Sequence, residues 1–154
     1  MKIYTSYFYH VRNLRPNQIP VNTAIWPPKW FTNKGHCFID KRGVLNGVNC
    51  SWLVPGMHCE NLCRGPQFCA DHNPEYCLFL QEYYKQISSL DFDSLVSKLV
   101  EVGEKAKELL EFTEEPEIIL MFHEKYDNPC SERWMVKRLF KEHGINIEEY
   151  TKGV

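Results

Sequence analysis

The segment EIILMF, residues 117–122, is the feature that most limits what this chain can fold into. Five apolar residues follow one another here, between the polar segments TEEP and HEKYDNP. A strand with one solvent-exposed face alternates between apolar and polar residues, whereas a strand buried on both faces has a nearly continuous apolar sequence. Such strands belong to parallel sheets that are covered on both sides. The segment therefore predicts an α/β fold with a mainly parallel, Rossmann-like sheet.

Other segments supply the remaining elements of this fold. KIYTSYFY and VNTAIW are rich in β-branched and aromatic residues and predict two further strands. NPEYCLFLQEYYKQI predicts a helix with Asn73 as cap and Pro74 at the first helical position. A second helix is predicted from a cap at Asp91, with apolar residues at helical spacing. A last helix is predicted from Ser131, or slightly before it, to near Gly144.

The length of 154 residues fits one domain. We predict a single three-layer α/β domain over residues 1–154, with helices flanking the sheet and a cysteine-rich metal-binding insertion at 57–78. With a net charge of -2, the protein has no broad positive potential that would attract the phosphate backbone of a nucleic acid. No apolar stretch long enough to cross a bilayer is present, and the N-terminus lacks the pattern of a secretory signal. We therefore expect a cytoplasmic protein without membrane association.

The cysteines indicate a metal site. Seven is an odd number, and thiols in the cytosol are kept reduced, so ligation or reactivity explains them better than disulfides. Cys59, Cys63, Cys69 and Cys77 lie close together, and four thiolates at such separations suit a tetrahedral, structural zinc site. An iron–sulfur cluster would use the same four residues, and His72 is an alternative to any one of them. The remaining alternative is a loop of unligated cysteines.

Cys130 is the candidate nucleophile. In open parallel sheets the usable crevice lies at the carboxyl ends of the strands, and Cys130 follows the predicted strand 117–122. If Asn128 caps the last helix and Pro129 is its first residue, the helix dipole stabilises a thiolate at Cys130. Arg133 would then share that face and bind an anionic group. The alternatives are a small buried cysteine and an arginine that is only a surface charge.

The segment WPPKWF predicts a place where a flat ligand stacks. Two prolines stiffen the chain after the second predicted strand and hold Trp30 next to Lys29. Tyr7 is near the carboxyl end of the first predicted strand and is expected at the same edge of the sheet. Trp30, Lys29 and Tyr7 are therefore the candidate ligand-binding residues. The alternative is that the aromatic rings of this segment cover the hydrophobic core.

Four segments, IYTSYF, AIWPPKWF, LDFDSL and ILMFHEKYDNPCSER, resemble in this order the uncharacterised family known as domain of unknown function 488. The likeness runs through nearly the whole chain, and CENLCRGPQFC resembles an insertion that some members carry. The family has cysteine, histidine and arginine where this chain has Cys130, Ser131, Glu132 and Arg133. A histidine that could transfer protons is therefore absent.

The resemblance implies one α/β domain with a crevice near Glu124, Lys125, Cys130 and Arg133, but it implies no particular reaction. Two functions follow from the residues. The first is an enzyme for a small phosphorylated or nucleotide-like ligand: Cys130 is nucleophile or anion contact, Arg133 binds negative charge, Glu124 or Lys125 moves protons and Trp30 stacks. The alternative is a non-catalytic, zinc-stabilised module that binds a nucleic acid or a protein partner.

Overall fold

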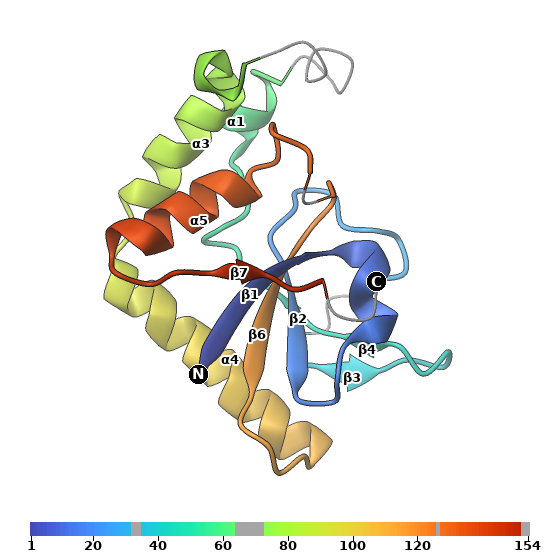
Figure 1. Cartoon of the computed structure of the whole chain (residues 1–154). Coiled ribbons are helices and arrows are strands. Elements are labelled where there is room, and N and C mark those ends of the chain that lie inside the picture. The colour runs from blue at the N-terminus through green and yellow to red at the C-terminus, as the bar shows by residue number, and fades with distance from the viewer. Residues whose placement is uncertain (32–34, 64–72, 126, 152–154) are drawn as a thin grey trace.

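The computed structural model describes residues 1–31, 35–63, 73–125 and 127–151. Its central feature is a five-stranded sheet in the order β5-β2-β6-β1-β7, in which all neighbours run parallel (Figure 1). A separate antiparallel pair joins β3 to β4. The strands are β1 (Lys2–Tyr7), β2 (Gln18–Asn22), β3 (Phe38–Ile39), β4 (Leu45–Asn46), β5 (Val48–Asn49), β6 (Glu117–Phe122) and β7 (Glu148–Glu149). The α/β class and the parallel sheet are confirmed.

The helices lie mostly in the second half of the chain. They are α1 (Met57–Glu60), α3 (Leu78–Ser88), α4 (Phe92–Leu110) and α5 (Arg133–Glu142), with 3-10 helices η1 (Phe8–Asn13) and η2 (Pro74–Tyr76). The Asp91 side chain accepts the Ser94 N–H at 3.3 Å and caps α4, as predicted. Gly144 has a φ of +82° just after α5, which confirms the predicted end of that helix. Within the described residues, no helix combines the length and apolar character needed to cross a bilayer.

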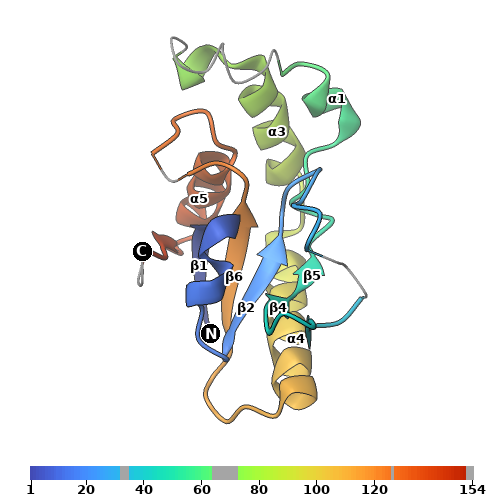
Figure 2. The same ribbon diagram turned by 90° about the vertical axis from the view of Figure 1, so that its right-hand side faces the viewer.

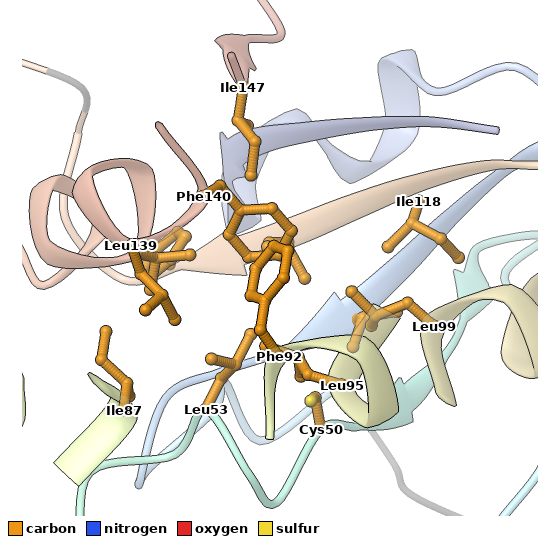
Figure 3. Packing of buried hydrophobic residues seen from close by; sticks show 14 of the residues in the cluster. Cys50, Leu53, Ile87, Phe92, Leu95, Leu99, Ile118, Leu139, Phe140 and Ile147 are labelled. Atoms are coloured by element: carbon orange, nitrogen blue, oxygen red, sulfur yellow. The ribbon is translucent and has the colours of Figure 1, made fainter. Parts of the chain in front are cut away.

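β6 is the central strand, and its two faces contribute to two separate cores, the larger of which is shown in Figure 3. Ile118 and Phe122 contribute to the larger core, which also contains buried residues of α3, α4 and α5. Ile119 and Met121 point to the opposite face, where a smaller core contains residues of η1 and of the segment between β2 and β4. Among the described residues, α-helices thus cover one face of the sheet only, and the predicted three layers with helices flanking the sheet are not confirmed (Figure 2). Residues 8–17, which join β1 to β2, hold one short 3-10 helix.

The second strand differs from the predicted VNTAIW. β2 begins earlier, at Gln18, and ends at Asn22. The chain leaves the sheet there because side chains take over the backbone hydrogen bonds: Asn22 binds both N–H and C=O of Ala24, and Thr23 Oγ1 donates to the Met121 carbonyl. These bonds use up the groups that a longer strand would pair.

The connections from the two neighbouring strands β1 and β6 leave in opposite directions. From β1 the chain passes over β6 to reach β2, while from β6 it passes through α5 and over β1 to reach β7. The chain after β1 and the chain after β6 therefore both lie at the carboxyl ends of these strands, which is where open α/β sheets bind their ligands. The fold therefore places a candidate site above Tyr7 and Phe122.

Candidate functional site

The Arg133 side chain lies between the ends of β1 and β6. It is completely buried, and its guanidinium donates to the carbonyl oxygens of Ser6, at 3.4 Å, and of Glu124. Nη1 donates to Glu149 Oε2 of β7 at 2.6 Å, and Nε donates to Ser131 Oγ at 3.2 Å. Every nitrogen of the guanidinium is thus bonded to the protein. Arg133 is not a surface charge, and these contacts make it a residue that positions its neighbours.

The turn before α5 explains where Cys130 lies. The Asn128 side chain accepts the Cys130 N–H at 2.9 Å, and the helix begins only at Arg133. This helix start is later than predicted: the chain first forms a turn, in which the Ser131 N–H donates to the Asn128 carbonyl at 3.3 Å, and α5 begins after it. Cys130 is 8% exposed and precedes the helix, so its side chain is not in the first helical turn. The predicted support from the helix dipole is reduced accordingly.

Glu124 and Glu132 form a carboxyl pair that the sequence did not single out as a pair. Glu132 is 8% exposed, Glu124 is half-buried, and the two side chains share a hydrogen bond. Burial, followed by the negative charge of Glu124, raises the pKa of Glu132 to about 8, although the positive Arg133 acts in the other direction. The Ser131 hydroxyl lies 3.3 Å from Glu124 Oε2 and donates to it. Glu132 therefore holds its proton at neutral pH.

The end of β1 contributes a second set of polar groups. Ser6 Oγ donates to the Tyr150 carbonyl at 3.0 Å and lies 3.5 Å from His10 Nδ1. Burial lowers the pKa of His10; Glu149 opposes this shift, and the positive Arg133 and Lys125 add to it. Lys125 is exposed, and its charge acts on His10, so the chain after β6 and the chain after β1 meet at this edge.

Tyr7, a predicted ligand-binding residue, lies at the same edge. Its ring centroid is 5.0 Å from that of Tyr9 and 5.4 Å from that of His10. Burial and the neighbouring Tyr9 raise the pKa of Tyr7. The half-buried phenol is therefore neutral and available as a hydrogen-bonding group at neutral pH.

The predicted stacking residues lie on the face of the smaller core. Phe31 is 5% exposed, so the core-covering interpretation is confirmed for this ring. Trp30 is half-buried, packs edge-on against Phe8 and lines a cavity of about 140 Å³ together with Arg42. Lys29 is exposed. Phe8 also contacts the His123 ring, at 5.6 Å, and so links this cavity to the residues that follow β6.

The predicted metal ligands are only partly described. Cys59 is buried, with its sulfur 3.3 Å from His58 Nε2; Cys63 is exposed, and Cys77 is half-buried and precedes α3. Cys69 lies outside the described residues. Among the residues that are described, no group of three or more His, Cys, Asp or Glu side chains could hold a metal ion. The zinc site and the insertion therefore stay predictions.

Comparisons of the chain with protein-family models, with curated proteins and with solved structures found no match. The resemblance to domain of unknown function 488 thus also stays a prediction. What can be said of the site comes from its geometry alone.

Replacing Arg133 by Met should destabilise the protein by about 3–5 kcal/mol, because Glu149 and two carbonyl groups lose a buried cationic partner. Urea unfolding followed by circular dichroism measures this change. Arg138→Met is the matched control, since Arg138 is on the same helix and pairs with Glu142 at the surface. Its cost should stay below about 1 kcal/mol. Equal costs for the two variants would contradict the role given to Arg133.

Replacing Glu132 by Gln should stabilise the protein increasingly as the pH rises. The folded state holds the Glu132 proton up to about pH 8, whereas the unfolded chain releases it near the ordinary value of 4.5, so wild-type stability falls across this window. The variant should gain up to about 1.4 kcal/mol over wild type for each pH unit there. Unfolding free energies at several pH values measure the difference.

Glu142→Gln serves as the control for this titration, because hydrogen bonds from Tyr84 and Arg138 lower the pKa of Glu142. That variant should show no gain toward high pH. A difference between Glu132→Gln and wild type that is independent of pH would mean that Glu132 is ionised in the folded protein throughout.

Proposed function

We propose that the protein is an enzyme acting on a small phosphorylated or nucleotide-like ligand in the crevice above the carboxyl ends of β1 and β6. The observation that carries this proposal is the carboxyl pair Glu124–Glu132, held at the carboxyl end of the parallel sheet, in the chain that follows β6. Perturbed carboxyl groups in such a place are typical of active sites. Cys130 is in the same turn as Glu132.

In this proposal, the Glu124–Glu132 pair transfers protons. The histidine that would have this role in the domain of unknown function 488 family is absent from this chain. With the pKa of Glu132 raised to about 8, Glu132 is protonated at neutral pH and provides an acid beside the Glu124 carboxyl group. Glu124 is half-buried and is the member that meets the ligand, while Glu132 is the buried member that holds a proton. Lys125 and the phenol of Tyr7 are further candidates for ligand contact.

Cys130 and Arg133 have different roles in this proposal. Arg133 is a positioning residue, because its donors are engaged by Ser6, Glu124, Ser131 and Glu149. Cys130 is the nucleophile or a ligand contact, reached through its small exposed surface. The positive charge for an anionic ligand then comes from exposed lysines, Lys125 at this edge and Lys29 near Trp30.

Hydrolysis of p-nitrophenyl phosphate and of nucleoside monophosphates tests the enzyme. Glu132→Gln should lower the rate by about 10²–10⁴-fold and remove the limb of the pH profile near pH 8, because the pair loses its titrating proton. Cys130→Ser should also lower the rate. Cys37→Ser is the control, since Cys37 is a buried thiol on a different part of the fold. Wild-type protein that turns over none of these probes, or turnover that survives in Glu132→Gln, would refute the proposal.

A structural metal is a second proposal, with zinc first and an iron–sulfur cluster as the alternative, held by Cys59, Cys63, Cys69 and Cys77. The contact between the Cys59 sulfur and His58 Nε2, and the separation of Cys59 from Cys63 by about one helical turn, favour it. The metal would order the insertion 57–78, the surface that a nucleic acid or protein partner would contact if the protein is a binding module.

Metal analysis of protein purified without chelator tests this site. About one zinc per chain is expected, and Cys59→Ser should lose it while Cys37→Ser keeps it. Iron with visible absorbance would indicate a cluster instead. A folded protein without either metal would remove the proposal and leave the enzyme proposal intact.

A further inference from the structure

Two adjoining cavities lie between α4 and the chain around β5, apart from the crevice described above. One has a volume of about 250 Å³ and the other of about 270 Å³, and Asn49, Val102 and Lys105 line both. Ligand pockets usually measure about 300–1,000 Å³, so the two together reach the size for a small organic molecule. Asn49 ends β5 and pairs in register with Asn22, the last residue of β2. β5 is the outer strand of the sheet next to β2 (Figure 2), so the cavities are also at carboxyl strand ends, at this outer strand.

The charges around these cavities favour an anion. Lys98 and Lys105 are both exposed, and neither forms an ion pair with any described residue. The Trp52 ring holds Lys98 at the cavity, with Nζ 4.7 Å from the ring centroid. Glu101 is the carboxylate among the lining residues, so two cations face one anion.

Neutral donors and an apolar floor complete the site. Asn49 Oδ1 accepts a hydrogen bond from Asn22, which directs the Asn49 amide N–H groups toward other acceptors. Ser51 adds a hydroxyl at the exposed rim. Leu99 and Val102 of α4 line the floor. Two ammonium groups and two neutral donors suit a dianion better than a single carboxylate, and the floor suits an apolar body attached to it.

We propose that these cavities bind a small phosphate monoester with a flat apolar body, such as a nucleoside monophosphate. Lys98 and Lys105 bind the phosphate, the Asn49 amide donates to it, and the apolar body lies on Leu99 and Val102. The site does not depend on the Glu124–Glu132 pair, and its ligand need not be the substrate of the proposed enzyme.

Calorimetric titration with AMP tests this site. Lys98→Ala and Lys105→Ala should each weaken binding by about two- to fivefold, as expected for one exposed charge contact. Glu101→Gln should strengthen binding, because it removes the charge that repels the phosphate. Lys107→Ala is the matched control: Lys107 is on the same helix but does not line either cavity, and its removal should leave the affinity unchanged.

Adenosine and inorganic phosphate separate the two halves of the ligand, and both should bind more weakly than AMP. The proposal is overturned if AMP does not bind, if the two lysine variants bind it as wild type does, or if inorganic phosphate binds as tightly as AMP. AMP binding that is lost in Glu132→Gln or Cys130→Ser, but kept in the lysine variants, would overturn this site while supporting the strand-end crevice. Loss in the lysine variants with hydrolysis unchanged would support this site alone.

Discussion

The pairing of the buried Arg133 guanidinium is the interaction on which the rest of the site depends. A buried charge is tolerated only when hydrogen bonds and an opposite charge surround it. Glu149 of β7 provides the charge, and the carbonyl groups of Ser6 and Glu124 provide acceptors at the ends of β1 and β6. One side chain from α5 thus ties together three neighbouring strands of the sheet, and it fixes where the helix begins.

That arrangement accounts for the unusual chemistry around it. Because the guanidinium occupies the gap between the strand ends, the turn before α5 lies directly above the sheet, and Glu132 is buried beside Glu124. Arg133 lowers the pKa of Glu132, but burial and Glu124 outweigh it. A carboxyl group that folding leaves in an unfavourable environment costs stability, and such costs are characteristic of functional sites.

The sequence predicted those elements whose signals are local. The apolar segment 117–122 became β6 with the predicted bounds, and the Asp91 cap and the glycine after α5 fixed two helix ends. The start of α5 was predicted too early, since the preference of Asn128 for a cap or a turn depends on the chain that follows. The burial of Glu132 was not predicted, because it is caused by contacts with residues that are distant in the sequence. A glutamate next to an arginine ordinarily indicates a pair at the surface.

The cavities at the edge of the sheet have a geometric origin that no local signal contains. α4 spans Phe92–Leu110 and so extends for about 28 Å, whereas β5 holds two residues and covers about 7 Å. A helix of this length extends beyond so short an edge strand, so β5 covers only part of the side chains on the facing side of α4. The space is bounded by the chain on either side of β5, which contributes Cys37 and Trp52, and by Asn49 at the end of β5. The length mismatch between α4 and β5 thus opens a place for a ligand. This place lies at the carboxyl ends of the strands, as the Glu124–Glu132 pair does, but beside β5 and not beside the strands that Arg133 connects.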